Sequence, residues 1–398
     1  MAQTNSSKLI TKDFIIAFVM QVLNITCFSI FNAVIPFWMT DKFNSNPAEI
    51  GLVIGLAGLS PIIARPFMGH LLDRFGRKGI LQITVVSGGI FSLILTLAKD
   101  PTAILILRFV QLIPFVATST ALATIASDVV PEDRRGEGLS YFTTSTTLPF
   151  AFGPTIGLFL YKSNWLYPFY AAAAIGTMSL LGTLFFKLPK IEMTTKKFSV
   201  KATFDKRILI AAIISAFAFL ALPTIFSFVA LYGEEISLNP DRVGLVYASY
   251  AASLLITRLV GAKTIDKKDP KFSGISSFVF LIFGMVTIGL ARSILWMVVG
   301  GFLVGAGLGI IFPTLLMMAI NMVPEKRGVC NAMVYAGIDV ASSIGASIFG
   351  VVANFVGKYS PSYMVIAGLE LAGLVVFLAF TMPLYKKAIQ KEIVLGNS

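Results

Sequence analysis

Two acidic side chains, Asp339 and Glu370, lie deep inside long apolar runs, where a carboxyl group is costly unless it has a function. Asp339 shares a helical face with Ser342 and Ser343, as expected for one wall of a polar cavity. A carboxyl group removed from water binds a proton more readily, so Asp339 is a candidate for proton coupling, with Glu370 as second candidate. A structural ion pair between Asp339 and an arginine is the alternative.

Three arginines, Arg65, Arg108 and Arg258, also lie within apolar runs. A guanidinium group inside a membrane usually faces a cavity or a partner. Gln111 follows Arg108 by about one helical turn and lies on the same face. We therefore expect Arg108 and Gln111 to line a substrate cavity. The alternative is that Arg108 extends along the helix to the outer membrane surface.

A polar stripe in the first apolar run supplies further cavity candidates. It consists of Gln21, Asn24, Phe28 and Asn32. These residues share one face of a helix, which suits a cavity lining. Hydrogen bonds between helices would explain the same stripe equally well.

The elements that must position these residues are membrane helices. Of the 398 residues, 56% are hydrophobic and only 13% are charged, far too few charges to cover a soluble protein of this size. Twelve runs reach about the 20 residues that cross a bilayer. They are 14–38, 49–69, 79–98, 102–129, 138–161, 166–187, 208–231, 243–262, 273–291, 294–322, 331–357 and 362–385. The predicted fold class is an all-α membrane protein with twelve transmembrane helices.

The basic residues set the predicted orientation. With the N-terminus in the cytoplasm, 23 of the 32 Lys and Arg residues fall in cytoplasmic segments and six in outer segments. This asymmetry predicts an inner cell membrane protein with both termini cytoplasmic. The net charge of +12 therefore gives no reason to expect nucleic acid as a partner.

The sequence repeats itself at an offset of 193 residues, where Arg65 falls on Arg258 and Asp73 on Asp266. An even number of helices per half makes the repeat parallel, with a binding site expected between two six-helix halves. The predicted division is 1–187 for the N-terminal half, 188–207 for a basic cytoplasmic linker and 208–398 for the C-terminal half.

The connection between the second and third spans reads Gly69-His-Leu-Leu-Asp73-Arg74-Phe-Gly76-Arg77-Lys78. It resembles the signature loop G-x-x-x-D-R-x-G-R-K of the major facilitator superfamily. The resemblance implies a conformational latch that closes the cytoplasmic side, with Arg77 paired to an acid at the end of the fourth span. Asp128 stands at that position. The predicted latch residues are Gly69, Asp73, Arg74, Gly76, Arg77, Lys78 and Asp128.

The fifth span contains Gly153-Pro154-Thr-Ile-Gly157. It resembles the antiporter motif G-x-x-x-G-P-x-x-G-G of the same family, although Pro149 and Leu158 stand where the family has glycine. Glycines four apart allow close helix packing, and Pro154 bends the helix. Ordinary tight packing is the alternative meaning of these glycines.

Together these features predict a secondary active transporter and not an enzyme. The preferred function is proton-coupled efflux of small amphipathic molecules by alternating access, in the manner of the drug:proton antiporters that the motifs resemble. The alternatives are export of one endogenous metabolite, such as a sugar or a zwitterionic metal chelator, and, from another class, a multi-helix membrane transferase.

We expect a monomer in the lipid bilayer that binds a small-molecule substrate, with no catalytic residue, metal or cofactor besides the proton gradient. An ATP-driven pump is disfavoured because no glycine run ends in Lys-Ser or Lys-Thr.

Overall fold

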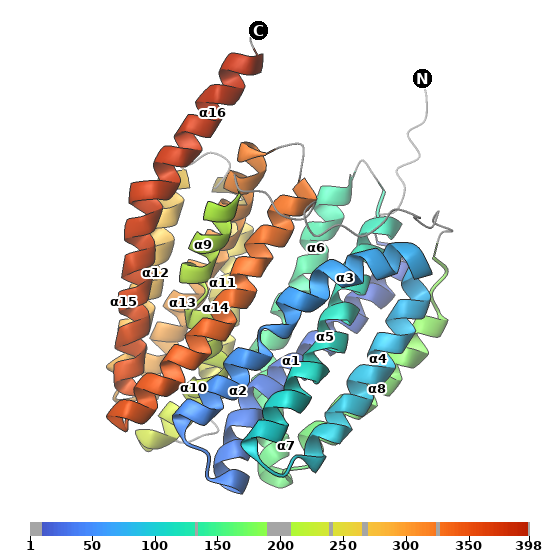
Figure 1. Cartoon of the computed structure of the whole chain (residues 1–398), viewed down its shortest axis with the longest axis vertical. Helices are drawn as coiled ribbons and strands as arrows, with labels where there is room; N and C mark the ends of the chain where they lie inside the picture. The colour runs from blue at the N-terminus through green and yellow to red at the C-terminus, as the bar shows by residue number, and fades with distance from the viewer. Residues whose placement is uncertain are drawn as a thin grey trace.

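The chain folds into a bundle of long helices, and the part of it described by this computed structural model contains no strand. That part comprises residues 10–131, 134–188, 208–238, 242–264, 270–323 and 327–396. The helices run roughly side by side in two groups, α1 to α8 and α9 to α16 (Figure 1). The N-terminal end of α1 and the C-terminal end of α16 lie at the same end of the bundle, which we call the termini face (Figure 1). The other end is the opposite face.

The first group forms six spans. Its helices are α1 (Lys12–Phe43), α2 (Pro47–Ala57), α3 (Ser60–Phe75), α4 (Arg77–Ile94), α5 (Pro101–Val129), α6 (Arg135–Thr147), α7 (Pro149–Ser163) and α8 (Tyr167–Leu184). A 3₁₀ turn, Leu95–Leu97, extends α4. The second span consists of α2 and α3, and the fifth of α6 and α7.

The second group also forms six spans. Its helices are α9 (Leu209–Ala218), α10 (Ala221–Glu235), α11 (Gly244–Thr264), α12 (Pro270–Gly289), α13 (Ile294–Met322), α14 (Arg327–Val356), α15 (Ser360–Val376) and α16 (Met382–Gly396). The seventh span consists of α9 and α10, and a π-helical turn, Phe377–Thr381, joins α15 to α16. Within the described residues, nine spans are long and apolar enough to cross a membrane.

Three spans that the sequence predicted as continuous are broken. The breaks lie at Gly58–Leu59, at Leu148 and at Phe219–Leu220. A proline is close behind the first two breaks, since α3 begins with Ser60-Pro61 and α7 begins at Pro149. Proline lacks a backbone N–H and is tolerated in the first turn of a helix, so each of these positions starts a new helix. The predicted linker 188–207 lies outside the described residues except for Leu188.

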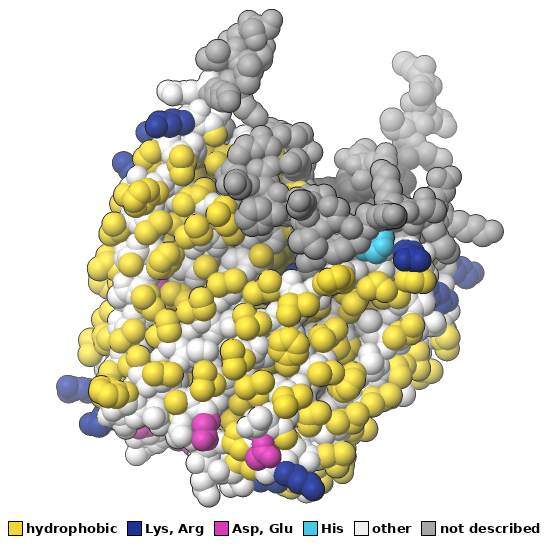
Figure 2. Space-filling model, in the orientation of Figure 1, with side chains coloured by type: hydrophobic (Ala, Val, Ile, Leu, Met, Phe, Trp, Pro, Cys, Tyr) yellow, Lys and Arg dark blue, Asp and Glu magenta, His cyan; other side chains and the backbone are white. Residues whose placement is uncertain are grey.

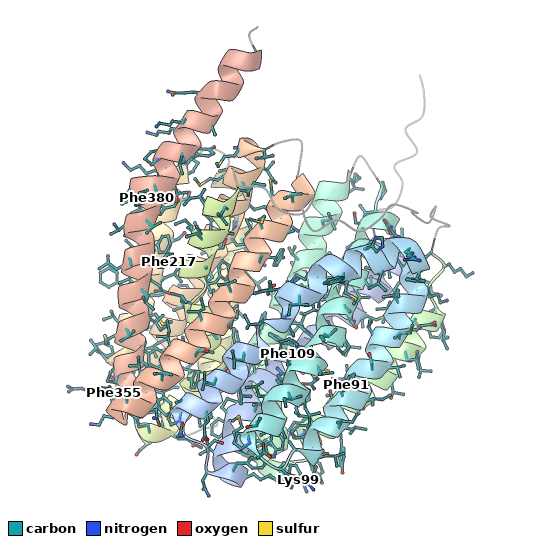
Figure 3. The ribbon with its side chains drawn as sticks, in the orientation of Figure 1. Phe91, Lys99, Phe109, Phe217, Phe355 and Phe380 are labelled. Atoms are coloured by element: carbon teal, nitrogen blue, oxygen red, sulfur yellow. The ribbon has the colours of Figure 1, made fainter. Side chains whose placement is uncertain are left out.

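The flank of the bundle is apolar and its two ends carry the charges. Figure 2 shows hydrophobic side chains over the flank of both groups, with Lys and Arg at either end. Phe355 and Phe380 project outwards, with 89% and 60% of their surfaces exposed (Figure 3). Such exposure of phenylalanine is expected where lipid is the solvent.

Near the opposite face the two groups meet along α2 and α14. A Cβ atom built on Gly51 would lie 2.5 Å from the carbonyl oxygen of Ala346 and 2.9 Å from the Cα of Gly350. Both neighbouring atoms belong to the backbone, so only glycine fits at this crossing. A second contact joins α7 to α11, where a Cβ on Gly244 would lie 2.6 Å from Thr155 Oγ1. We call these two contacts the opposite-face seam.

Candidate functional site

A cavity lies between the two groups of helices, and we call it the central cavity. Its walls are mainly apolar and aromatic. The lining residues are Phe28, Phe31, Asn32, Ile35, Val53, Ile54, Gly58, Arg108, Leu112, Phe150, Leu222, Pro223, Phe226, Ser227 and Ser342. Phe150 of α7 and Phe226 of α10 lie against each other, with ring centroids 4.6 Å apart, so both groups contribute to one aromatic wall.

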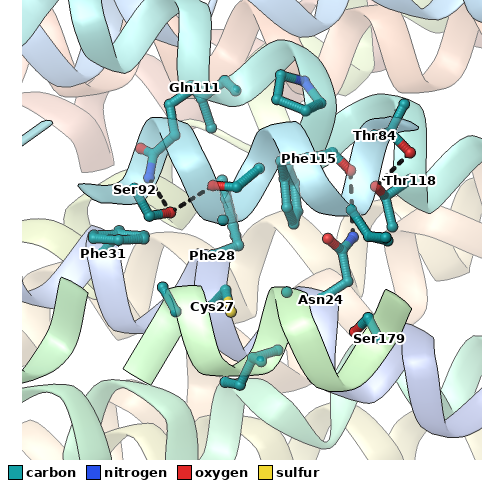
Figure 4. A pocket seen from close by; sticks show the side chains of 18 of the residues that line it. Asn24, Cys27, Phe28, Phe31, Thr84, Ser92, Gln111, Phe115, Thr118 and Ser179 are labelled. Atoms are coloured by element: carbon teal, nitrogen blue, oxygen red, sulfur yellow. Dashed lines mark hydrogen bonds between the residues drawn. The ribbon is translucent and has the colours of Figure 1, made fainter. Parts of the chain in front are cut away.

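A second cavity lies entirely within the N-terminal group, between α1, α4, α5 and α8, and we call it the inner chamber. Its polar lining includes Asn24, Ser92, Gln111, Thr118 and Ser179, most of which carry hydrogen bonds to neighbouring helices (Figure 4). The residues that line both cavities are Phe28, Phe31, Arg108 and Leu112. The two cavities are therefore neighbours across a thin wall.

Arg108 is the charged residue of that wall. Only 4% of its surface is exposed, so the alternative in which it extends to the outer surface is wrong. Its Nη1 donates to Gln111 Oε1 at 2.6 Å and its Nη2 donates to Asn32 Oδ1 at 3.1 Å. Gln111 Nε2 in turn donates to Ser92 Oγ at 2.9 Å (Figure 4). With its amide nitrogen bound in this way, Gln111 presents its carbonyl oxygen to the guanidinium group. The Arg108 Cζ also lies 5.3 Å from the ring centroid of Phe31.

The polar stripe of α1 divides between the two predicted roles. Asn24 lines the inner chamber and donates from Nδ2 to the carbonyl oxygen of Phe115 at 3.3 Å. Asn32 lines the central cavity. Gln21 is among the lining residues of neither cavity, and its Nε2 donates to Ser119 Oγ at 2.8 Å. For Gln21 the hydrogen-bond alternative is therefore the better description.

Asp339 of α14 is paired with Arg65 of α3. Arg65 donates from Nε to Asp339 Oδ2 at 2.9 Å and from Nη2 to Oδ1 at 3.3 Å. Asp339 is not among the residues that line the central cavity, although Ser342 on the same face is. Asp339 therefore forms an ion pair with an arginine and lies outside the lining of the central cavity, and its role in proton coupling stays a prediction. The pair joins residues 274 positions apart and connects the two groups of helices.

Arg258 of α11 is the repeat counterpart of Arg65. It makes the corresponding contact between α11 of the C-terminal half and α6 of the N-terminal half. Its Nη1 donates to Thr147 Oγ1 of α6 at 2.8 Å. Counting back 193 residues from Asp339 reaches Thr146, the neighbour of Thr147. The two halves thus contact each other twice through pseudo-equivalent arginines, once with a carboxylate and once with a hydroxyl group. The repeat singles out both arginines in the sequence, but it says nothing about their partners.

The predicted latch lies mostly on a helix and not in a loop. Residues up to Phe75 belong to α3, and Gly76, with φ of 87°, turns the chain into α4. Arg77 donates from Nε to Asp128 Oδ2 at 3.0 Å, and this is the pair expected from the sequence. Both residues belong to the N-terminal group, so their pair fixes the α3–α4 turn and does not itself bridge the halves.

The other latch residues have varied surroundings. Lys78 donates from Nζ to the carbonyl oxygen of Phe186 at 3.3 Å. Arg74 is exposed, with its Cζ 5.3 Å from the ring centroid of Phe75. Gly69 and Asp73 are helical residues of α3, but the surroundings of Gly69 and of the Asp73 side chain lie outside what the structure describes.

The antiporter motif packs α7 closely against α1. Gly153, Pro154 and Gly157 are all buried. A Cβ on Gly153 would overlap the Ser29 hydroxyl, and one on Gly157 would lie 3.0 Å from the Cα of Ile30. Close packing accounts for these glycines, and the antiporter role stays a prediction.

Glu370 of α15 is fully buried, at 0% exposure. Neither of its carboxyl oxygens has a hydrogen-bond partner among the described residues. It lines neither of the two cavities, so it is a separate buried carboxyl group of the C-terminal half.

Comparison with known proteins agrees with this architecture. The family model described as Major Facilitator Superfamily matches residues 17–329 and 208–393. An uncharacterised MFS-type transporter of Methanocaldococcus jannaschii is 24% identical over 81% of this chain and 87% of its own length. The quinolone resistance protein NorA of Staphylococcus aureus is 22% identical over 87% of this chain and 90% of its own length.

A solved structure has the same fold. The crystal structure of a D-xylose–proton symporter covers 91% of this chain and 96% of its own, with a TM-score of 0.71 and 16% identity. The prediction of an all-α membrane protein with twelve helical spans in two six-helix halves is thereby confirmed. The chain therefore belongs to the Major Facilitator Superfamily and is a multi-pass membrane transporter.

Proposed function

We propose that this transporter exports small amphipathic molecules from the cell by alternating access, driven by the proton gradient. The observation that carries the proposal is the central cavity, whose aromatic walls come from both halves. Such a cavity can hold an apolar or aromatic body of many shapes, because aromatic contacts depend little on exact hydrogen-bond geometry. The likeness to NorA, which is named for quinolone resistance, supports efflux as the direction.

The seam and the ion pair suggest how the cycle works. We propose that both termini are cytoplasmic and that the protein acts as a monomer in the cell membrane, so the opposite-face seam closes the extracellular side. Opening that side requires the backbones of α2 and α14 to separate at Gly51 and Gly350. The Arg77–Asp128 pair would keep the α3–α4 turn in shape while the halves move.

Proton coupling is assigned to Asp339 in this proposal. In the described conformation its carboxylate is held by Arg65. Proton binding to Asp339 would cancel its charge and weaken the pair, so the gradient could act directly on a contact between the halves. The proton symporter of the same fold supports proton coupling as a driving force for this architecture.

The test is transport by the purified full-length protein in proteoliposomes. Norfloxacin, a quinolone, would be measured crossing the membrane against its gradient with an imposed pH difference. We expect uphill flux that stops when an ionophore collapses the pH difference. Flux that ignores the pH difference, or no flux of norfloxacin or of an amphipathic dye, would contradict the proposal.

A further inference from the structure

The charge of the two cavities is unusual for a binding site that accepts cations. Among the described residues that line the central cavity and the inner chamber, Arg108 is the charged one, and it lines both. Asp339 and Glu370 are absent from both linings. Asp339, the candidate for proton coupling, already forms an ion pair with Arg65. The space available to cargo therefore carries a net positive charge.

This positive charge is buried without a carboxylate. Within the described part of the chain, Arg108 forms no ion pair, and its hydrogen bonds go to the neutral amide oxygens of Gln111 and Asn32. A buried charge without a counter-ion is expensive, and inside a membrane such a charge usually faces a cavity and marks a substrate or ion pathway. The amide network holds the guanidinium group in place without cancelling its charge.

The geometry also leaves donors for such a ligand. A guanidinium group carries five N–H donors, of which two are occupied here. The remaining three suit the two oxygens of a carboxylate or sulfonate, which guanidinium binds in a bidentate manner. Phe28 and Phe31 line both cavities together with Arg108, and the Phe31 ring lies 5.3 Å from the Arg108 Cζ, so an apolar surface is available beside the charge.

We propose that the cargo is an amphipathic organic anion, with its anionic group bound by Arg108 and its apolar body held by the phenylalanines of the central cavity. This inference rests on the proposed function, since it names the substrate class of the same cavity. It differs from the alternatives of a cationic drug or a neutral sugar, because neither of these would satisfy the charge of Arg108.

The experiment uses three probes of similar size and different charge. They are 1-naphthoate, 1-naphthylmethanol and 1-naphthylmethylammonium, titrated by calorimetry into the purified full-length protein in detergent without any gradient. We expect 1-naphthoate to bind the wild-type protein about 10- to 100-fold more tightly than the ammonium probe. Arg108→Gln should remove this preference, and Arg108→Lys should keep part of it because the charge stays while the planar fork is lost.

Arg292→Gln is the matched control, since it removes an exposed arginine between α12 and α13. Its binding should equal that of the wild type. Equal affinity of the wild type for anion and ammonium, no binding of 1-naphthoate, or wild-type binding by Arg108→Gln would overturn the proposal. The comparison of probes on the wild type decides the matter even if Arg108→Gln does not fold. Because this assay needs no pH difference, a transporter that binds the anion but shows no gradient-driven export would refute only the proposed function.

Discussion

Arg65 and Asp339 join the two halves of the transporter through two hydrogen bonds from one guanidinium group to one carboxylate, at 2.9 and 3.3 Å. The Arg65 side chain is 35% exposed and that of Asp339 only 10%, so the pair is partly screened by its surroundings. A contact of this kind is weak enough to open during a transport cycle and strong enough to bias it.

Asp339→Asn should uncouple transport from the proton gradient. The amide keeps the shape of the side chain but cannot bind a proton or form the ion pair. We expect pH-driven uphill export in proteoliposomes to fall at least about tenfold while downhill exchange stays within about twofold, and unfolding free energy to drop by about 1 kcal/mol. The charge swap Arg65→Asp with Asp339→Arg should recover the stability and part of the coupling, because it restores a carboxylate that can bind a proton in the same ion pair. Wild-type pumping by Asp339→Asn would make the residue structural and leave Glu370 as the remaining candidate.

Thr147→Asp should convert the uncharged contact of Arg258 into a second ion pair between the halves. Since Thr147 already accepts a hydrogen bond from Arg258 at 2.8 Å, a carboxylate there would lie within reach of the guanidinium group. We expect a higher melting temperature and slower export, because the described conformation is stabilised relative to the others. Thr147→Asn, which adds no charge, is the control. A lower melting temperature for Thr147→Asp together with unchanged export would refute the predicted pairing.

Gly51→Ala should prevent the opposite-face seam from closing. The new methyl group would meet backbone atoms of α14 at 2.5 and 2.9 Å, and backbone cannot move aside cheaply. We expect export to fall about tenfold or more and a cysteine placed in the central cavity to react faster with a membrane-impermeant reagent added outside. Gly368→Ala is the matched control, since a Cβ on this helical glycine of α15 has no neighbour within 4 Å. Equal behaviour of the two variants would show that the seam does not need glycine.

Asp128→Asn should loosen the α3–α4 turn. The change removes the carboxylate that holds Arg77 at 3.0 Å. Gly79→Cys offers a reporter, because this position is exposed with open space around it, and Cys27→Ser with Cys330→Ser removes the native thiols. A nitroxide spin label on the reporter should become more mobile in Asp128→Asn, because the turn that carries it loses one charged hydrogen bond. Unchanged mobility would mean that the bond from Arg77 to the carbonyl oxygen of Leu72 is sufficient to hold the turn.

Glu370→Met should stabilise the protein. The buried carboxyl group has no hydrogen-bond partner among the described residues, so an apolar side chain of similar length avoids its desolvation cost. We expect an unfolding free energy higher by about 1 to 3 kcal/mol, with Glu370→Gln close to the wild type. If Glu370 carries protons, pH-driven export will fall in both variants although Glu370→Met is more stable. Unchanged export by both variants, together with raised stability of Glu370→Met, would show that Glu370 has no role in proton coupling.

The sequence predicted the spans well because the solvent is lipid, and apolar length is then the dominant signal. It also predicted the pair of Arg77 and Asp128, since the resemblance to the signature loop implies an acid at the end of the fourth span as the partner of Arg77. The breaks at Gly58, Leu148 and Phe219 were missed. A break costs only a few hydrogen bonds, and packing against neighbouring helices decides whether the chain accepts it.

The pairing of Asp339 was beyond the sequence for a different reason. Its partner Arg65 lies 274 residues away in the other half, and which arginine it meets depends on how the halves are rotated against each other. Arg258 has the same residue type and the same repeat position, yet it meets a threonine. The sequence pattern alone therefore cannot tell which of the two arginines pairs with Asp339.

The hydrogen bonds of Arg108 all stay within the N-terminal half, on α1 and α5. When the halves rock apart, this charge keeps the same neighbours and therefore the same intrinsic pull on an anion. The cargo would thus stay bound to the N-terminal half throughout the cycle, with the same contact to Arg108 whichever side of the membrane the cavity opens to. Whatever makes it leave must come from the C-terminal half, where Phe226, Ser227 and Ser342 join or withdraw from the pocket. Substitutions in these C-terminal residues should change the rate of cargo release, while substitutions around Arg108 should change which molecules bind.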